Sequence, residues 1–261
     1  MKKLFAILFL ALVLVVTGCT FEPKTEQPQD ILKLAQSRGK FIVGVTLDAK
    51  PFGFKNSAGQ PDGFDIDVAK RIAKEILGSE KAIDFVEINS YDSILSVATG
   101  KVDFLIAATT ITPQRQILVN FSEPYFTSNQ AILVPENSKI EKVKDLNNKK
   151  VIVKLNSTSE KTPKKYAPTS ILIGYKTRME AFQAFKSGKG DAIISDNTLL
   201  HGFLMDNSGY KILPFKLSVE PYGIAMQNTP EAKDLKSNID AVISHMKADG
   251  TISKLKNKWK V

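Results

Sequence analysis

The stretch GKVDFLIAATTITPQR, residues 100–115, has the composition of a tight turn, a buried strand and a polar segment at the carboxyl end of that strand. A shorter version recurs as GKGDAIISDNT at residues 188–198, and a helical pattern precedes the turn in both places. Two further apolar strands, at residues 41–45 and 151–155, open two similar stretches of the chain. This repetition predicts two α/β lobes that are built alike.

Polar side chains follow the two repeated strands. Thr109 and Thr110 end the first strand, and Ser195, Asp196 and Asn197 end the second. Ligands of open α/β sheets bind at the carboxyl ends of the strands. Two such edges that face each other form a cleft, so we expect the binding site to lie between the lobes.

Helical patterns lie between and after these strands. Apolar side chains recur at helical spacing between residues 68 and 77, where Asp65 is expected to cap the helix and Gly78 to end it. Residues 232–246 and 252–259 have similar amphipathic spacing. We interpret these stripes as core packing, because the apolar face of such a helix usually faces the interior.

The chain begins with the pattern of an export signal over residues 1–18. Two lysines precede an apolar run from Leu4 to Val16. This run is shorter than the roughly 20 residues that a transmembrane helix needs. It therefore predicts a cleaved signal peptide rather than a membrane span.

The signal ends in VTGC, which resembles the bacterial lipobox and implies that Cys19 carries the lipid of a lipoprotein. A soluble secretion signal, in which the cysteine follows Gly18 by chance, is the alternative. Residues 19–29 are rich in Pro, Thr, Gln and charge, so we interpret them as a tether. We expect the protein at the outer face of the cytoplasmic membrane or facing the periplasm, held in the lipid bilayer through Cys19.

The composition narrows the class of protein further. Cys19 is the only cysteine, so no intramolecular disulfide can form, and a hydrophobic content of 43% supports a packed core. The net charge of +9 falls to +7 when the signal is removed, since residues 1–18 contain two lysines and no acid. The lysines are spread along the chain without an arginine-rich block. We interpret this charge as a solvated face and expect no nucleic-acid partner.

Arg115 is the first candidate for ligand binding. Thr112 is expected to cap a helix with Pro113 at its first position, which places Arg115 in the first turn. The helix dipole disfavours a cation there, whereas the free N–H groups and the guanidinium together suit a carboxylate. A solvent-facing Arg115, or one paired with a surface acid, is the alternative.

Asp196 supplies the complementary charge at the end of the second repeated strand. Its carboxylate could hold an ammonium group, or it could cap a helix before Thr198, Leu199 and Leu200. One charge of each sign on facing edges matches the zwitterion of an amino acid.

The segment GFDIDVAKRIAKEI, residues 63–76, resembles the signature of the bacterial extracellular solute-binding proteins of family 3, which are polar amino-acid receptors of ABC importers. VDFLIAATTITPQR and FSEPYF also resemble family stretches, and the similarity extends from Arg38 to Trp259. The resemblance implies the two-lobed α/β fold of the type II periplasmic binding proteins, with the ligand cleft between the lobes.

The resemblance also implies how the chain is divided. Lobe 1 is expected to contain residues 30–127 and 223–261, and lobe 2 residues 128–222. Two crossing segments, near residues 125–129 and 220–223, are expected to act as a hinge that closes on the ligand.

The family's ligand-binding positions can be matched to this sequence. Thr110 and Arg115 match the residues that hold the α-carboxylate, Asp196 matches the one that takes the α-ammonium, and Ala108 matches a backbone contact. NSTS, residues 156–159, resembles the turn that completes the carboxylate cage, with Asn156 in place of the usual glycine. The candidate ligand-binding residues are Thr110, Arg115, Asp196, Ala108, Ser157, Thr158, Lys154, Phe52 and Asp48.

The pocket for the ligand side chain departs from several family patterns. Ala49 stands where receptors for basic amino acids often have an aromatic residue, and Thr46 stands where acidic amino-acid receptors have lysine. Lys50 is a possible replacement partner for an acidic side chain, and SDNTLL and AKPFG look like segments of cysteine-binding members. Glutamine, glutamate or aspartate, and cysteine or cystine are the candidate ligands, with a neutral polar one preferred. The aromatic candidates for the pocket wall are Phe52, Tyr91, Phe126 and Tyr222.

The implied partners are a free polar amino acid and the ABC permease and ATPase complex in the membrane. The protein is expected to act as a monomer without cofactor or metal. An enzyme on the same fold, such as a cyclohexadienyl dehydratase, is the alternative, and a surface adhesin is a third class. The chain contains only two histidines and shows no triad order, Walker loop, GxGxxG or metal-ligand spacing. A dehydratase could work with carboxylates alone, so the feature that favours a binding protein over an enzyme is the pair of Arg115 and Asp196.

Overall fold

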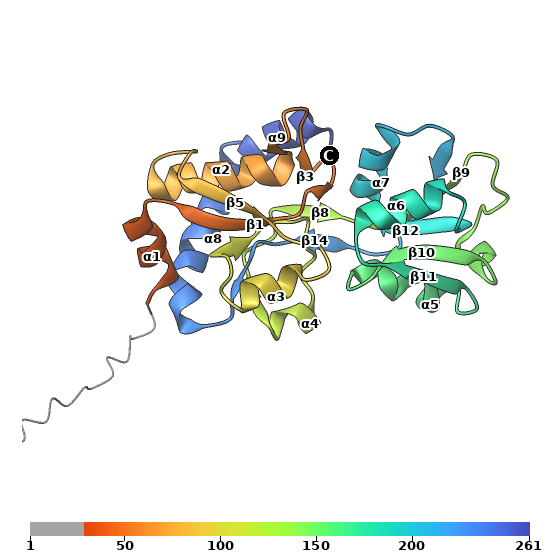
Figure 1. The fold of residues 1–261 in the computed structure, drawn as a ribbon, viewed down its shortest axis with the longest axis horizontal. Coiled ribbons are helices and arrows are strands. Elements are labelled where there is room, and N and C mark those ends of the chain that lie inside the picture. Colours follow the sequence, from red (N-terminus) through yellow and green to blue (C-terminus); the bar gives the residue numbers. More distant parts are fainter. Residues whose placement is uncertain (1–28) are drawn as a thin grey trace, which may run out of the picture.

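The computed structural model describes residues 29–261. The predicted signal peptide, Cys19 and nearly all of the predicted tether lie outside the described residues. Figure 1 shows two α/β lobes that lie next to each other and are joined by strands near the middle of the molecule. The predicted two-lobed α/β architecture is therefore confirmed.

The first lobe is built on a five-stranded sheet with the order β5-β1-β6-β15-β7. β1 runs parallel to β5 and β6, whereas β15 is antiparallel to β6 and β7. The strands of this sheet are β1 (Phe41–Val45), β5 (Ile83–Glu87), β6 (Phe104–Leu105), β7 (Val119–Phe121) and β15 (Ala225–Gln227). A small sheet beside it contains β2 (Asp48–Ala49), β3 (Gly53–Lys55) and β4 (Pro61–Asp62).

Helices from both ends of the chain complete this lobe (Figure 1). They are α1 (Ile31–Arg38), α2 (Phe64–Leu77), α3 (Ser93–Ala98), α4 (Pro113–Gln116), the 3₁₀ turn η3 (Pro230–Ala232), α8 (Lys233–Ala248) and α9 (Thr251–Trp259). The last two confirm the helices predicted from amphipathic spacing. The buried faces of α1, α2, α8 and α9 pack with β1 and β6 in one core cluster.

The second lobe repeats this arrangement with the strand order β11-β10-β12-β9-β13. β10 (Lys150–Lys154) runs parallel to β11 (Ile171–Tyr175) and β12 (Ala192–Asp196), whereas β9 (Gln130–Pro135) is antiparallel to β12 and to β13 (Tyr210–Ile212). Its helices are η1 (Val143–Leu146), η2 (Thr158–Glu160), α5 (Thr162–Tyr166), α6 (Arg178–Lys186) and α7 (Asn197–Leu204). Separate clusters of buried side chains cover the two faces of this sheet.

The lobes are joined by β8 (Phe126–Ser128) and β14 (Glu220–Tyr222), which pair as an antiparallel ribbon. These strands coincide with the two segments that the sequence predicts to be the hinge. The exact lobe boundaries stay a prediction.

The start of α2 differs from the sequence prediction. Gly63, not Asp65, occupies the cap position, and the side chain of Asp65 is fully buried in the first turn. Its carboxylate accepts hydrogen bonds from the backbone N–H of Ala108 at 2.7 Å and from the hydroxyl of Tyr125 at 2.8 Å. The prediction of a cap is therefore wrong, because a partner distant in sequence binds this carboxylate instead.

The strand predicted over residues 104–110 is also shorter than expected, because β6 ends at Leu105. Ala108 has a φ of 47°, which lies in the left-handed region and cannot continue a strand. The bond from Ala108 to Asp65 holds this conformation. Residues 107–110 consequently form a polar loop at the edge of the sheet instead of more strand.

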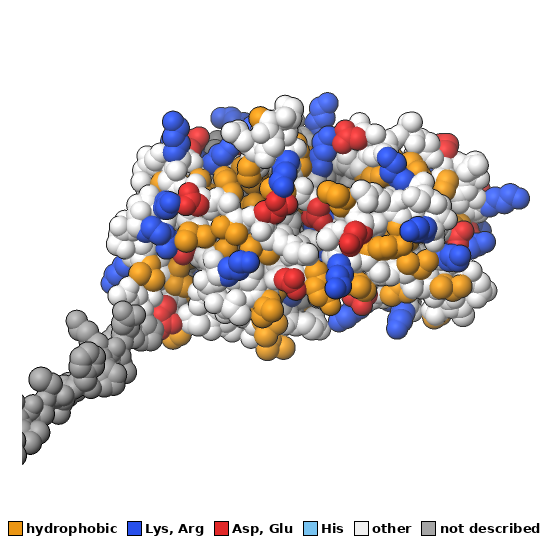
Figure 2. Space-filling model, viewed as in Figure 1, with side chains coloured by type: hydrophobic (Ala, Val, Ile, Leu, Met, Phe, Trp, Pro, Cys, Tyr) orange, Lys and Arg blue, Asp and Glu red, His pale blue; other side chains and the backbone are white. Residues whose placement is uncertain are grey.

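The surface of the described part mixes both charges. Figure 2 shows Lys and Arg side chains spread over the viewed face, with Asp and Glu among them. This distribution supports the interpretation of the positive charge as a solvated face. Among residues 29–261, no helix has the length and apolar character needed to cross a membrane.

Asp65→Asn is predicted to change how stability depends on pH. Burial raises the pKa of Asp65 to about 7, although hydrogen bonds from Tyr125 and Ala108 act in the opposite direction. An acid whose pKa is higher in the folded state stabilises the fold below its unfolded pKa, near 4, and loses that contribution as the pH rises towards 7. We expect the wild-type free energy of unfolding to fall by about 2–4 kcal/mol more than that of Asp65→Asn between pH 4 and pH 8.

Urea unfolding at a series of pH values measures this difference. Asp234→Asn, at an exposed position of α8, is the control. Parallel pH profiles for the wild type and Asp65→Asn would show that the carboxyl group does not resist ionisation in the folded protein.

Candidate functional site

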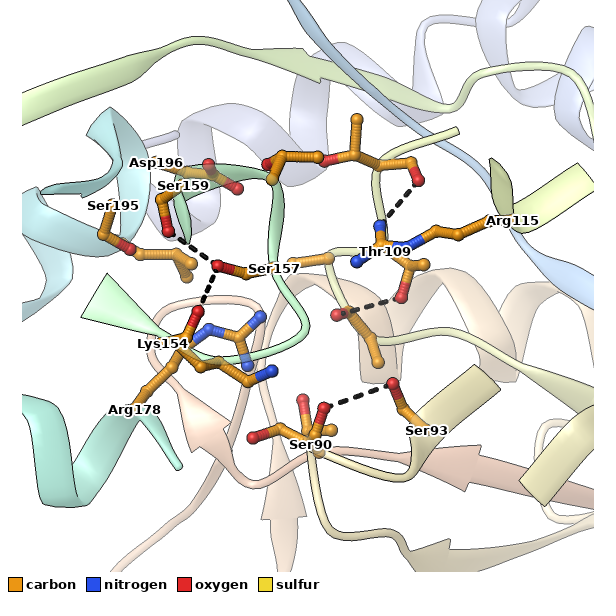
Figure 3. A pocket seen from close by; sticks show the side chains of 16 residues that line it. Ser90, Ser93, Thr109, Arg115, Lys154, Ser157, Ser159, Arg178, Ser195 and Asp196 are labelled. Carbon is orange, nitrogen blue, oxygen red and sulfur yellow. Dashed lines mark hydrogen bonds between the residues drawn. The ribbon is translucent and has the colours of Figure 1, made fainter. Parts of the chain in front are cut away.

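A small polar cavity lies between the lobes. The loops after β1 and β6 reach it from one side, and the ends of β10 and β12 reach it from the other (Figure 3). Its lining is Thr46, Ser90, Ser93, Ala107, Ala108, Thr109, Thr110, Arg115, Lys154, Ser157, Thr158, Ser159, Arg178, Ser195, Asp196 and Leu199. The carboxyl ends of strands in both sheets therefore meet at one site.

Arg115 enters this cavity from the first turn of α4. As predicted, Thr112 caps that helix by accepting a hydrogen bond from the backbone N–H of Arg115 at 3.2 Å, and Pro113 occupies the first position. The guanidinium donates to the carbonyl oxygen of Thr110 at 2.7 Å and, across the cleft, to that of Asn156 at 3.2 Å. Its partners are neutral, so this cation lies in a cavity where an anion would be stabilised.

Burial lowers the pKa of Arg115, and the negative charge of Asp196 opposes this change. Removal from water disfavours the charged form of the guanidinium, and this desolvation is the reason that its pKa is lowered. Among the described residues, Arg115 forms no salt bridge with a carboxylate. The alternative in which Arg115 pairs with a surface acid is thus not observed.

Asp196 ends β12 on the other side of the cavity and is buried. It occupies the cap position of α7, yet its carboxylate makes no capping bond and instead accepts a hydrogen bond from the hydroxyl of Tyr222 on β14. Burial raises the pKa of Asp196 to about 6, and the bond from Tyr222 limits that rise. The alternative of a side-chain cap is not observed, and the carboxylate is available to a ligand cation.

The side-chain hydroxyls of the turn at residues 156–159 form hydrogen bonds with the preceding strand β10 and with the connecting strand β14. Asn156 has a φ of 57°, a conformation that asparagine tolerates in place of the usual glycine. The Ser157 hydroxyl donates to the carbonyl oxygen of Lys154 at 2.6 Å. The Thr158 hydroxyl donates to Glu220 at 2.9 Å and receives a bond from Gln130 at 2.8 Å. The hydroxyl of Thr158 therefore ties the turn to the connecting strand β14.

Lys154 and Arg178 bring two more cationic groups to the cavity. The ammonium of Lys154 donates to the carbonyl oxygen of Leu155 at 3.1 Å. Burial lowers the pKa of Lys154 to about 7, and the charge of Arg178 adds to this effect. Figure 3 shows the side chains of Lys154 and Arg178 side by side, with Arg115 pointing in from the opposite side.

Two candidates from the sequence do not line the cavity. Phe52 is fully buried and packs edge-to-face against the rings of Phe64, Phe126 and Tyr222. Asp48 is not part of the cavity lining, and its carboxylate accepts hydrogen bonds from Arg178. The structure brings the other candidates together at the cavity: Ala108, Thr110, Arg115, Lys154, Ser157, Thr158 and Asp196.

The remaining side-chain candidates also lie elsewhere. The aromatic residues Tyr91, Phe126 and Tyr222 are absent from the cavity lining. Lys50 pairs with Asp206 at 2.8 Å near the outer edge of the cleft and is not a partner for a ligand in this cavity. The aromatic wall expected from the sequence is therefore replaced by hydroxyls and charges.

Arg178 lines the cavity but is not among the residues predicted from the sequence. Thr177 caps α6 after β11, and Arg178 takes the first helical position. In the first lobe a threonine, Thr112, likewise caps the helix, but Arg115 there takes the third helical position. Its partner Asp48 lies 130 positions earlier in the chain, so no local pattern marks Arg178.

The lobes contact each other at the mouth of the cleft. A Cβ added to Gly202 of α7 would overlap the carbonyl oxygen of Lys50, which follows β2 in the first lobe. The Asn156 side chain also donates to the carbonyl oxygen of Tyr91 at 3.4 Å. The absence of a side chain at Gly202 thus permits the close approach of the two lobes.

Comparison with known proteins agrees with this geometry. The family model of the bacterial extracellular solute-binding proteins, family 3, matches residues 41–261. The ABC transporter glutamine-binding protein GlnH of Bacillus subtilis is 37% identical, over 99% of this chain and 97% of that protein. The glutamine-binding protein of Geobacillus stearothermophilus is 38% identical, over 84% of this chain and 89% of that protein.

A solved structure is similar as well. An ancestral arginine-binding protein bound to glutamine has a TM-score of 0.79 and 40% sequence identity, and the match covers 85% of this chain and 98% of that one.

Gly202→Leu is predicted to hold the lobes apart. The added side chain would occupy the space of the Lys50 backbone, so the contact at the cleft mouth cannot form. We expect a larger radius of gyration than that of the wild type in small-angle X-ray scattering with saturating polar amino acids. His201→Ala, at an exposed position on the same helix, is the control. Identical scattering curves for Gly202→Leu and the wild type would contradict the prediction.

Proposed function

The chain belongs to the bacterial extracellular solute-binding proteins of family 3, and from this premise we propose that its cavity binds the zwitterion of glutamine. The protein is a substrate-binding component of amino-acid transport, which works with the membrane permease and ATPase of an ABC importer, and it is not an enzyme. Free glutamine outside the membrane is the proposed ligand, and closure of the lobes around it is the proposed mechanism.

The observation that carries this proposal is the placement of Arg115 and Asp196 on opposite sides of one cavity between the lobes. An α-carboxylate would accept hydrogen bonds from Arg115 and Thr110, and an α-ammonium would donate to Asp196. Each buried charge then gains a partner of opposite sign, which offsets the cost of its removal from water. The two partners come from different lobes, so ligand binding and lobe closure stabilise each other.

The choice of glutamine rests on the charges near the ligand side chain. Arg178 already pairs with Asp48, and the pKa of Lys154 is lowered to about 7, so Lys154 is only partly charged at neutral pH. An acidic side chain would need a full cationic partner there, whereas a side-chain carbonyl oxygen needs only hydrogen-bond donors. The two glutamine-binding relatives support the same choice.

We also propose the lobe boundaries and the oligomeric state. Residues 30–127 with 223–261 form one lobe, residues 128–222 form the other, and the β8–β14 ribbon is the hinge. The two five-stranded sheets support these boundaries, because the strands of one lie within residues 41–121 and 225–227 and the strands of the other within residues 130–212. The binding protein acts as a monomer, because one chain supplies both sides of the cavity.

Arg115→Ala is predicted to remove most of the affinity for glutamine. Truncating one partner of a buried charged hydrogen bond costs about 2–5 kcal/mol, which corresponds to roughly 30-fold to several-thousand-fold in affinity. Isothermal titration calorimetry of the protein against the twenty amino acids and cystine measures this, after partial unfolding and refolding to remove any bound ligand. The matched control is Arg71→Ala, because Arg71 pairs with Glu75 and Asp249 outside the cavity.

Tight binding of glutamine that Arg115→Ala abolishes and Arg71→Ala preserves is the expected result. Binding of none of these compounds would overturn the amino-acid assignment for this cavity. Tight binding of another polar amino acid alone would overturn the choice of glutamine.

We further propose that the lipid of Cys19 anchors the protein at the outer face of the membrane. The VTGC motif at the end of the signal supports this location. Cys19→Ser is predicted to move the protein from the detergent phase to the aqueous phase in Triton X-114 partitioning of whole cells, since the lipid would be lost. Equal partitioning of the wild type and Cys19→Ser would show that the cysteine is not the anchor.

A further inference from the structure

Arg178 is a charged group in the cavity lining that takes no part in the proposed contacts with the zwitterion. It lies in the first turn of α6 and its side chain is only 12% exposed. Its positive charge lowers the pKa of four buried groups at or near the cavity, namely Asp65, Arg115, Lys154 and Asp196. Because the charge of Arg178 acts on groups at both sides of the cavity, it will also interact electrostatically with a ligand that lies between them.

Asp48 holds Arg178 in place from the other lobe. The backbone N–H of Arg178 donates to one oxygen of Asp48 at 2.9 Å, and its guanidinium donates to the other at 3.2 Å. The hydroxyl of Ser90 also donates to Asp48, at 3.2 Å. The carboxylate therefore has three donors, and the pair spans the cleft between β2 and α6.

The pair is nearly buried at both ends, since the Asp48 side chain is only 14% exposed. A guanidinium has five N–H donors, and one of them contacts Asp48, so Arg178 retains donors for another acceptor. Lys154 lies beside it in the cavity, as Figure 3 shows. This end of the cavity consequently offers hydrogen-bond donors and positive charge to the side chain of a ligand.

We propose that Arg178, held by Asp48 across the cleft, determines side-chain specificity by donating a hydrogen bond to a neutral carbonyl group and excluding a cationic side chain. The proposal rests on the assignment of the cavity to an amino acid and names the residue that selects among amino acids. A guanidinium or ammonium of the ligand would meet Arg178 and Lys154, and like charges in a desolvated site repel strongly. A carboxylate on the ligand would compete with Asp48 for Arg178.

The pair predicts two opposite changes of specificity. Arg178→Met leaves Asp48 as a buried carboxylate without its charged partner, which would attract the guanidinium of arginine. Asp48→Asn leaves Arg178 as a cation without its carboxylate, which would attract the side chain of glutamate. The double variant Asp48→Asn/Arg178→Met removes both charges. Its affinities for arginine and for glutamate should therefore not increase.

The experiment titrates glutamine, glutamate, arginine and lysine into the wild type and the variants by calorimetry. We expect glutamine affinity to fall roughly 10- to 100-fold in Arg178→Met, the loss typical of a hydrogen bond to a charged group. Arginine affinity should rise at least about tenfold in Arg178→Met, and glutamate affinity should rise by a similar factor in Asp48→Asn. The double variant should bind arginine and glutamate no more tightly than the wild type does.

Two controls separate specificity from damage to the fold. Arg71→Met removes an arginine that pairs with carboxylates outside the cavity and should leave the order of the four affinities unchanged. Arg178→Gln is a second neutral replacement that retains a donor, and thermal unfolding of each variant confirms that it is folded. A gain of arginine binding in either neutral variant, lost again in the double variant, supports the proposal.

Unchanged relative affinities in folded Arg178→Met and Arg178→Gln would overturn it. An arginine gain that persists in the double variant would also overturn it, because Asp48 would then not be the new partner. Failure of the wild type to bind any amino acid would instead refute the proposed function. The two failures are therefore distinguishable.

Discussion

The buried carboxylate of Asp65 connects three parts of the first lobe that are distant in sequence. It lies in the first turn of α2 and accepts hydrogen bonds from the loop after β6, through Ala108, and from Tyr125, which directly precedes the connecting strand β8. The bond to Ala108 supports a left-handed backbone conformation there, which turns the loop into the cavity. The position of Arg115 depends on that loop. One desolvated acid thus links the helix, the binding loop and the segment that joins the lobes.

The charges of the cavity are compensated across the cleft rather than within one lobe. Arg115 of the first lobe donates to a carbonyl oxygen of the second, and Asp48 of the first lobe pairs with Arg178 of the second. Separation of the lobes would break both contacts and expose these groups to water. Since a buried charge is costly without a partner, lobe closure and charge compensation are coupled. This coupling explains how a small zwitterion can hold two large lobes together.

Much of the site was predictable because its signals are local. The cap formed by Thr112, the proline after it and the position of Arg115 depend on a few consecutive residues, and the structure shows this arrangement. Arg178 was missed because a single arginine at the start of a helix has no local partner in sequence. Its significance comes from Asp48, which lies 130 positions earlier in the chain. Phe52 was assigned to the pocket wall, but it packs in an aromatic cluster of the core.

The sequence by itself determined the repeated α/β pattern, the helices at the carboxyl end and the two facing polar strand ends, because hydrophobic periodicity and turn residues are local properties. It also determined the pair of opposite charges at Arg115 and Asp196. Only the tertiary structure decided that Asp65 binds a distant loop instead of capping its own helix, and that Asp48 restrains Arg178 instead of facing a ligand. Both outcomes depend on which buried donors lie within hydrogen-bond distance, and that is set by packing between segments far apart in the chain.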